Sequence, residues 1–176
     1  ETCRWREECG NQRVQRREFV KTHVQKVGLR GLGLFTSTRV VAGAVVGVYL
    51  GEVCRRRDAK KRAKVSGGEY ILEMKAPLGP YFIDAEALGT KMRYVNHSCD
   101  PNSQWRVWEV ARHPVLVCES LRCLELNEEV TVDYGGDYWI RPGPRNVAGF
   151  QCLCGCESCR FKPTIVDISS DSDEEV

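Results

Sequence analysis

The 176-residue sequence has no apolar run of the roughly 20 residues that span a membrane, and no hydrophobic segment of the kind that directs secretion. We therefore expect no membrane contact. Taken with the cysteine spacing described below, this favours a reducing intracellular compartment.

A strong amphipathic helical period is also missing, so a mainly helical domain is not expected. Short apolar or alternating segments recur instead, separated by turns, which is typical of strands. These segments are residues 19–24, 45–50, 70–74, 81–85, 115–119 and 128–135. The expected fold class is an irregular, mostly-β domain.

The glycine-rich residues 28–35 lack the downstream helix that would offer its N-terminus to a phosphate. The segment is therefore weak as a nucleotide-binding loop, because a lone Gly-x-Gly is a common pattern. Its glycines do leave backbone that a ligand can approach closely. We expect a turn that runs into a strand.

The length suits one domain with short appendages and a real core. The formal net charge of +2 is unevenly spread, since the last ten residues hold five acids and no base. Residues 1–166 therefore carry 26 bases against 19 acids, a charge of +7. A basic body suits either a polyanion or a basic peptide held in an acidic groove, so charge alone does not choose.

Ten cysteines in a chain of this size indicate disulfides or metal. Cys152, Cys154, Cys156 and Cys159 fall within eight residues. Cys-x-Cys pairs are too close to bridge each other comfortably, but they can converge on one zinc ion. Cys3 and Cys9 cannot complete a tetrahedral site alone, and a pair of free thiols is the simpler interpretation.

The run from Arg55 to Lys64 holds seven bases and one acid. Such a run is usually a solvated helix face. The functional alternative is a contact with the phosphates of nucleosomal DNA, which would show a steep salt dependence.

The end of the chain has an apolar segment followed by serines and acids. One interpretation is a disordered, solubilising end. The other is a strand added to a partner's sheet edge, with acids or phosphoserines against a basic rim. In the latter case Ile165 to Ile168 resemble a motif that binds SUMO.

Ten residues from Arg93 to Asn102 concentrate amide, imidazole, hydroxyl and thiol groups after an apolar run. Asn96 can donate and accept hydrogen bonds, His97 can do either or bind metal, and Cys99 can ligate zinc as a thiolate. The alternative is a polar turn whose side chains satisfy local backbone.

Together these segments resemble a SET-domain protein lysine methyltransferase followed by a post-SET zinc module, over roughly residues 9–160. The upstream Cys3-x5-Cys9 looks like the end of an AWS (associated-with-SET) segment. The matching segments are Arg30-Gly31-Leu32-Gly33-Leu34, Gly51-Glu52-Val53, Tyr70, Ile83-Asp84-Ala85, the stretch from Arg93 to Asn102, Glu129-Val130-Thr131-Val132-Asp133-Tyr134 and Cys152-x-Cys154-x4-Cys159-Arg160.

The resemblance implies a β-clip fold of short curved sheets with a C-terminal pseudoknot. It divides the chain into an AWS-like segment (1–18), a SET domain (19–137), a post-SET loop and zinc module (138–162) and an acidic tail (163–176). The implied reaction is methyl transfer from S-adenosylmethionine to a lysine, leaving S-adenosylhomocysteine. The subgroup acts on lysine 36 of histone H3, so a histone tail or nucleosome is the implied partner and the nucleus the implied location.

Site residues carry over from the matching motifs. Tyr134 would lie beside the transferring methyl group and Tyr70 would line the lysine channel. The implied contacts to the methyl donor are Arg30, Gly31, Leu32, Gly33, Tyr70, Arg93, Asn96, His97, Tyr134 and Leu153. The implied zinc ligands are Cys99, Cys152, Cys154 and Cys159.

The chain departs from the family pattern in two aromatic positions. Leu32 stands where an aromatic residue commonly lies against the donor. Val132 stands where an aromatic commonly helps to set the number of methyl groups, and Trp105 is positioned to fill that space. Cys156 is an extra thiol. These departures leave open a catalytically silent SET-like module that binds chromatin or a SUMO-bearing partner, a zinc-binding structural module, or another histone or non-histone substrate.

Overall fold

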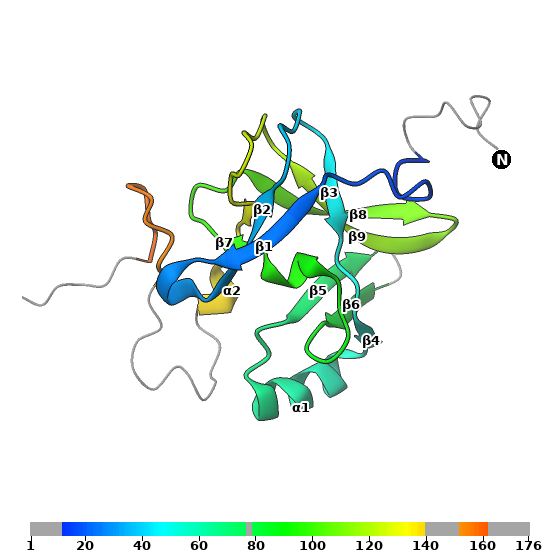
Figure 1. Ribbon diagram of the computed structural model, residues 1–176. Coiled ribbons are helices and arrows are strands. Elements are labelled where there is room, and N and C mark those ends of the chain that lie inside the picture. Colours follow the sequence, from blue (N-terminus) through cyan, green and yellow to red (C-terminus); the bar gives the residue numbers. More distant parts are fainter. Residues whose placement is uncertain (1–11, 77–78, 140–151, 162–176) are drawn as a thin grey trace, which may run out of the picture.

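A computed structural model describes residues 12–76, 79–139 and 152–161 (Figure 1). Its strands are β1 (Thr22–Lys26), β2 (Leu32–Thr36), β3 (Val45–Val48), β4 (Glu52–Cys54), β5 (Ile71–Ala76), β6 (Gly79–Asp84), β7 (Asn96–His97), β8 (Ser103–Val110), β9 (His113–Ser120) and β10 (Thr131–Val132). Its helices are η3 (Gly28–Arg30), α1 (Arg56–Ser66), η4 (Lys91–Tyr94) and α2 (Gly136–Trp139). The expectation of a mostly-β fold is confirmed.

Within the described residues the strands form four small sheets. The antiparallel sheets are the pair β1-β2 and the three-stranded sheets β3-β9-β8 and β4-β6-β5. The fourth sheet is the parallel pair of β7 and β10. This parallel pair joins two segments of the family motif that are more than thirty residues apart. The pseudoknot expected around it stays a prediction.

One apolar cluster lies where the sheets meet. Leu34, Val130 and Val132 have no exposed surface, and Leu124 has 1%. Complete burial of a Val or Leu side chain contributes roughly 1.5–3 kcal/mol. Tyr70, Trp105 and Tyr134 pack against the edge of this cluster, so the core supports the residues that the sequence singles out for catalysis.

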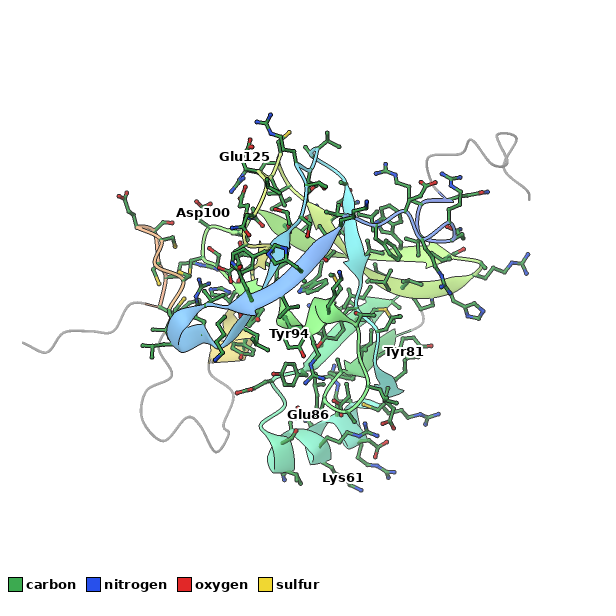
Figure 2. All side chains as sticks on the ribbon, viewed as in Figure 1. Lys61, Tyr81, Glu86, Tyr94, Asp100 and Glu125 are labelled. Carbon is green, nitrogen blue, oxygen red and sulfur yellow. The ribbon has the colours of Figure 1, made fainter. Side chains whose placement is uncertain are left out.

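The basic run forms the helix α1, which packs on β6 through Ala59 and Ala63. Lys and Arg have high intrinsic helix propensity, so α1 needs only a small apolar contact with the sheet to form. Gly67, with φ of 87°, ends the helix in the left-handed conformation that glycine adopts most readily. Lys61 points outward from the helix (Figure 2). The prediction of a helix with a solvated face is confirmed.

Most predicted strands are present with shifted ends. The strand expected over residues 19–24 is β1, which begins at Thr22 and ends at Lys26. We did not predict β8, which pairs with β9 along its whole length. No helix in the described ranges is long and apolar enough to cross a membrane. Cys3, Cys9 and the segment from Ile165 to Ile168 lie outside the described residues.

Candidate active site

The parallel pair of β7 and β10 builds the centre of the site. Asn96 pairs with Thr131 and His97 with Val132, so the polar stretch lies beside the segment that ends at Tyr134. The neighbouring Asn102 amide reinforces this pairing, since it donates to the Glu129 carbonyl at 2.8 Å and its oxygen accepts from the Thr131 N–H at 2.9 Å. Two distant motifs thereby form one surface.

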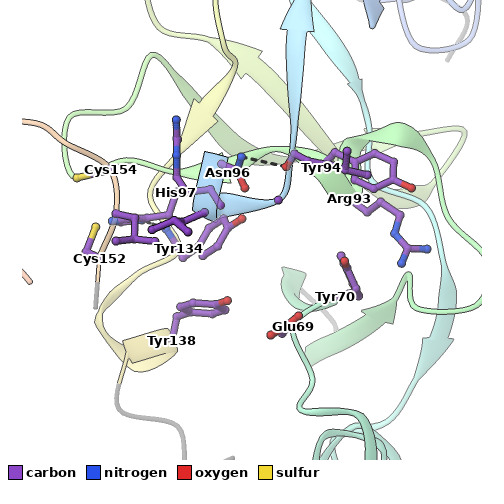
Figure 3. Close-up of a pocket in the computed structure, with 15 residues that line it drawn as sticks. Glu69, Tyr70, Arg93, Tyr94, Asn96, His97, Tyr134, Tyr138, Cys152 and Cys154 are labelled. Carbon is purple, nitrogen blue, oxygen red and sulfur yellow. Dashed lines mark hydrogen bonds between the residues drawn. The ribbon is translucent and has the colours of Figure 1, made fainter. Parts of the chain in front are cut away.

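A pocket of about 510 Å³ opens on this surface (Figure 3). Cys152 and Cys154 lie at one end of it and Arg93 and Tyr70 at the other. Nine of the ten predicted donor contacts line it, namely Arg30, Gly31, Leu32, Tyr70, Arg93, Asn96, His97, Tyr134 and Leu153. The structure thus brings together residues from five separate motifs, and the volume is in the range of small-molecule sites.

Gly33 is the predicted contact that does not line the pocket. A Cβ at this position would meet Val27 Cγ2 at 2.6 Å and Glu129 Oε1 at 2.8 Å. Glycine is needed here because the Glu129 side chain approaches closely. Gly31 does line the pocket, with φ of 78° and open space where a side chain would be, so its backbone is accessible to a ligand.

Glu129 supports the pocket from behind, although sequence analysis gave it no role. Its carboxylate accepts two hydrogen bonds from Arg30, at 2.8 and 3.2 Å, and one from Asn96 Nδ2 at 2.8 Å. Asn96 also donates to the Leu32 carbonyl at 3.1 Å. Bidentate, charge-assisted pairing fixes geometry as well as adding energy, so one carboxylate sets the position of two pocket residues.

The ring of His97 connects Tyr134 with Cys99. Its Nδ1 accepts a hydrogen bond from the Tyr134 backbone N–H at 3.1 Å, so the proton of a neutral ring lies on Nε2. Nε2 is 3.2 Å from Cys99 Sγ and can donate to it. Burial lowers the pKa of His97, which favours this neutral form.

Tyr134 lies between the pocket and the core. Its hydroxyl donates to the Val95 carbonyl at 2.7 Å, and its ring packs edge-on against Tyr138 at 4.6 Å. Burial raises the pKa of Tyr134 far above its ordinary value near 10, so the phenol stays protonated. It can orient a substrate amine but not act as a strong base.

A second, narrower cavity of about 40 Å³ adjoins the pocket. Tyr134, Tyr138, Glu69 and Arg93 line both spaces. The further lining residues are mainly apolar or aromatic, namely Tyr49, Ile71, Leu72, Met92, Val95 and Trp105. A wide pocket and a narrow, largely apolar cavity therefore meet at the Tyr134 ring.

Tyr70, expected in the lysine channel, lines the wide pocket and not the narrow cavity, and two contacts hold it there. The Arg93 guanidinium lies 4.1 Å from the centre of its ring, and the Tyr49 hydroxyl donates to its backbone carbonyl at 2.8 Å. Arg93 is itself fixed by a hydrogen bond from Nη1 to the Glu86 carbonyl at 2.8 Å. The Arg93 position therefore depends on the loop after β6.

The sulfur atoms of Cys99, Cys152, Cys154 and Cys159 lie within 4.8 Å of one another. Zinc–sulfur bonds of about 2.3 Å in a tetrahedron would place the sulfurs about 3.8 Å apart. Cys99 Sγ is 3.9 Å from both Cys152 and Cys159. The four predicted ligands therefore fit a zinc ion. Cys156 stands outside the group, with its sulfur 3.3 Å from that of Cys154.

An ion pair fastens the cysteine segment to the strand before Tyr134. Arg160 Nη2 donates to Asp133 Oδ2 at 2.7 Å, and the Arg160 backbone N–H donates to Cys99 Sγ at 3.4 Å. Burial raises the pKa of Asp133, but hydrogen bonds from the Gly135 N–H and from Arg160 outweigh it, and the pKa is lowered. Asp133 is therefore ionised at neutral pH.

Sequence analysis missed several residues of the pocket. Leu29, Glu69, Tyr94 and Tyr138 line it, as do the ligand residues Cys152 and Cys154. Leu29, Glu69 and Tyr94 each adjoin a predicted contact, so neighbourhood in sequence was a usable signal. Tyr138 follows the last matching motif strand in the short helix α2, and no local pattern marks it.

Comparison with known proteins agrees with this geometry. A model of the SET domain matches residues 31–135. The chain is 28% identical to an H3 lysine-36 specific histone-lysine N-methyltransferase of Mycosarcoma maydis, over 89% of this chain and 16% of that protein. It is 31% identical to histone-lysine N-methyltransferase ASHH1 of Arabidopsis thaliana, over 86% and 30% respectively. Drosophila melanogaster ash1 is 31% identical, over 88% and 7%. The chain thus spans under a third of each of these relatives.

Proposed function

The chain belongs to the SET-domain family, and from this membership and the geometry of its site we propose that it transfers methyl groups from S-adenosylmethionine to a lysine side chain of a protein. The observation that carries the proposal is the meeting of the two cavities at Tyr134. The wide pocket suits the donor and the narrow cavity suits a lysine side chain. Transfer would occur where they join.

The substrate amine must be neutral to react, because an ammonium has no lone pair. A largely apolar cavity lowers the pKa of a lysine by penalising its charged form. The lone pair then attacks the methyl carbon while the carbon–sulfur bond breaks and its electrons remain on sulfur. Alignment of the reacting atoms can contribute roughly 7–11 kcal/mol, so a rigid site is sufficient without a strong base.

Each wall has a part in that alignment. Arg30 and Asn96, both positioned by Glu129, would hold the donor's methionine end, and His97 would fix the backbone of Tyr134. Tyr134 and Tyr70 would border the reacting nitrogen. Zinc bound to Cys99, Cys152, Cys154 and Cys159 would be structural, and it would keep the neighbouring Leu153 at the pocket.

Histone H3, modified at lysine 36 within the nucleosome, is the substrate we propose, and the nucleus the location. The support is that relatives from fungi carry this specificity in their names, across most of this chain. The test is transfer of labelled methyl to recombinant nucleosomes and to free core histones, with the acceptor mapped by mass spectrometry. Label on H3 lysine 36 is expected.

Other outcomes of that test distinguish the alternatives. Label on another lysine keeps the reaction and rejects the substrate. Folded, zinc-loaded protein that binds the donor yet labels neither substrate indicates a non-histone target. Protein that does not bind the donor rejects the enzyme and favours the silent chromatin-binding or structural module.

The exposed face of α1 suggests how nucleosomes could be preferred over free histones. Lys60, Lys61 and Lys64 are exposed, lie on one helix face by their spacing, and form no ion pair with any described residue. Arg56 and Arg62, in contrast, are paired with Glu73 and with Glu52 and Asp84. Unpaired lysines suit DNA phosphates.

Charge reversal tests the DNA contact. Lys60→Glu with Lys61→Glu and Lys64→Glu should reduce methylation of nucleosomes and flatten its salt dependence, yet leave methylation of free H3 unchanged. Lys75→Glu is the control, because Lys75 is exposed but lies on the edge strand β5 and not on α1. Equal losses on both substrates would reject the contact. SUMO binding by the tail stays a prediction.

A further inference from the structure

Cys156 is a fifth thiol beside the four sulfurs that fit zinc. Its Sγ lies outside their group, yet it is 3.3 Å from Cys154 Sγ. Within the group, Cys99 Sγ is 3.9 Å from the sulfurs of Cys152 and Cys159. A thiol that the four predicted ligands leave unused is thus in direct contact with one of them.

The local backbone brings the two sulfurs together. Gly155 separates the cysteines and has φ of 72°, a conformation that glycine adopts at little cost, and a Cβ there would meet nothing within 4 Å. The Cys159 N–H donates to the Cys156 carbonyl at 3.2 Å, which closes the turn at residues 157–158. Gly155 and this turn therefore fix Cys156 beside Cys154.

Small solutes can reach Cys156. Its own surface is partly exposed, and the neighbouring Gly155 and residues 157–158 are exposed. Redox-sensitive cysteines are typically accessible thiols that lie next to a second cysteine able to form a disulfide. Cys118, in contrast, is completely buried, and Cys123 is exposed but outside the sulfur cluster. Cys156 combines access with a close sulfur neighbour.

We propose that Cys156 is a site of oxidation by peroxides, at which it forms a disulfide with Cys154 and removes one ligand from the zinc site. Cys156 is the thiol that reacts first, because its sulfur has no bond to the metal. The reaction itself needs only the thiols and the oxidant. Its effect on binding of the methyl donor rests on the proposed function.

The oxidation takes place in two balanced steps. The Cys156 thiolate attacks one oxygen of hydrogen peroxide, so a sulfur–oxygen bond forms and the oxygen–oxygen bond breaks with release of hydroxide. The Cys154 thiolate then attacks the Cys156 sulfur, so the disulfide forms and the sulfur–oxygen bond breaks with release of a second hydroxide. One proton from the Cys156 thiol and one from solvent turn both hydroxides into water. The peroxide is reduced and the two sulfurs are oxidised.

The bridge should be easy to reduce. A disulfide bond of about 2.05 Å requires the two sulfurs to approach by roughly 1.3 Å, and closing it over a single intervening residue is strained. Strained, accessible disulfides are the ones that thiols cleave readily. A thiol reductant with added zinc should therefore restore the site.

Loss of this ligand acts on the wide pocket. Cys154 lines the pocket together with Cys152 and Leu153. Residues 152–161 hold no helix or strand, so their position depends on the sulfurs and on one ion pair to Asp133. Oxidation should therefore displace this wall and prevent the binding of S-adenosylhomocysteine.

The test compares wild type with Cys156→Ser in hydrogen peroxide, using zinc-loaded full chains. In wild type, peroxide should release the zinc, as measured with a chromogenic chelator, and abolish binding of S-adenosylhomocysteine in a calorimetric titration. Cys156→Ser should keep both at the peroxide concentration that empties the wild-type site. Cys123→Ser is the matched control, because it removes an exposed thiol outside the cluster, and it should lose zinc as wild type does.

Mass mapping of the oxidised wild type identifies the bond. After alkylation of free thiols, fragmentation should place the disulfide between Cys154 and Cys156. A disulfide in another pair, or sulfinic acid at Cys156 in its place, overturns the inference, as does release of zinc from Cys156→Ser at the wild-type rate. Wild type that holds no zinc when reduced also overturns it.

Two further outcomes are assigned in advance. If Cys156→Ser does not fold, Cys156→Ala and the mass mapping decide. A chain that forms the disulfide and releases zinc, but that never binds S-adenosylhomocysteine in its reduced form, refutes the proposed function and keeps the oxidation site.

Discussion

Two walls of the pocket that we propose for the donor are held together by different forces. On one side, Arg30 at the end of η3, Asn96 in β7 and Glu129 just before β10 lie beside a buried apolar cluster, and hydrogen bonds fix their side chains. On the other side, residues 152–161 contain no helix or strand and reach the core through cysteines and the ion pair of Arg160 with Asp133. Burial stabilises the first wall, whereas the second would depend on the proposed zinc.

Removing zinc should have the largest effect, because it should displace the second wall and leave the first in place. Chelation, or Cys152→Ser, should abolish binding of S-adenosylhomocysteine because the second wall leaves the pocket, while the sheets stay folded on their own core. Calorimetric titration measures binding, and far-ultraviolet circular dichroism measures the sheets.

Cys156→Ser is the matched control for zinc removal. Its sulfur stands outside the four-cysteine group, so this variant should retain one zinc per chain and normal binding. Unchanged ligand binding by metal-free protein would show that the second wall needs no metal.

Tyr134→Phe should act on the reaction and not on either wall. Loss of the hydroxyl oxygen, which can accept a hydrogen bond from the substrate amine, should lower turnover by about 10²-fold, the usual order for one oriented polar group in a reacting site. Loss of its bond to Val95 should lower the free energy of unfolding by about 1 kcal/mol. Single-turnover kinetics and chemical denaturation separate the two effects.

The pH dependence sharpens the role of Tyr134. Burial keeps its pKa above the ordinary value, so the rate should rise with pH as the substrate amine loses its proton, with no tyrosine ionisation below about pH 10.

Tyr81→Phe is the matched control for Tyr134→Phe. Tyr81 lies on β6 at the edge of the same cluster, and this variant should turn over normally. Full activity of Tyr134→Phe would remove this hydroxyl from the mechanism.

Glu129→Gln tests the first wall. It should weaken donor binding about tenfold, because Arg30 and Asn96 lose the acceptor that positions both. Glu125→Gln is the matched control, since Glu125 forms the same bidentate pair with Arg39 on the exposed surface. Equal behaviour of the two variants in a binding titration would deny Glu129 a positioning role.

Acid should loosen the first wall slightly. Burial raises the pKa of Glu128, but hydrogen bonds from Arg122, the Glu125 N–H and Asn102 outweigh it, and the pKa is lowered. Its stabilising effect is therefore complete above the unfolded-state pKa of about 4.3 and disappears as pH falls through the folded-state value.

Glu128→Gln should accordingly lower the free energy of unfolding by about 1 kcal/mol at pH 7. The difference from wild type should shrink below about pH 4. Urea denaturation between pH 3 and 7 measures both; a difference that is constant across this range would contradict the prediction.

Local pattern predicted the buried parts of the fold well. The β-branched segment between glycines at 43 and 51 became β3, with all four residues from Val45 to Val48 buried. The alternating segments at 70–74 and 81–85 became the antiparallel pair β5 and β6. β8 escaped because Arg106 and Val107, which lie on opposite faces of the strand, are both exposed, so no clean alternation marks it.

Family motifs predicted most of the residues that line the site, but not the residues that hold them in place. The resemblance identified all four sulfurs that converge, whereas the cysteine spacing alone grouped Cys156 with Cys152, Cys154 and Cys159. The pair of Arg30 with Glu129 joins residues 99 apart, and nothing near either residue encodes the other. Trp105 was suspected from a missing aromatic at position 132, but only three-dimensional packing reveals that its N–H is buried without a partner among the described residues.

The parallel pairing of Asn96–His97 with Thr131–Val132 has a kinetic consequence. Its two strands are separated along the chain by the whole β8-β9 hairpin, so their contact closes a long loop and forms slowly compared with the local hairpins. The donor pocket should therefore be among the last parts of a newly made chain to appear. Productive encounter with the methyl donor would then report completed folding, and partly folded copies would remain inert.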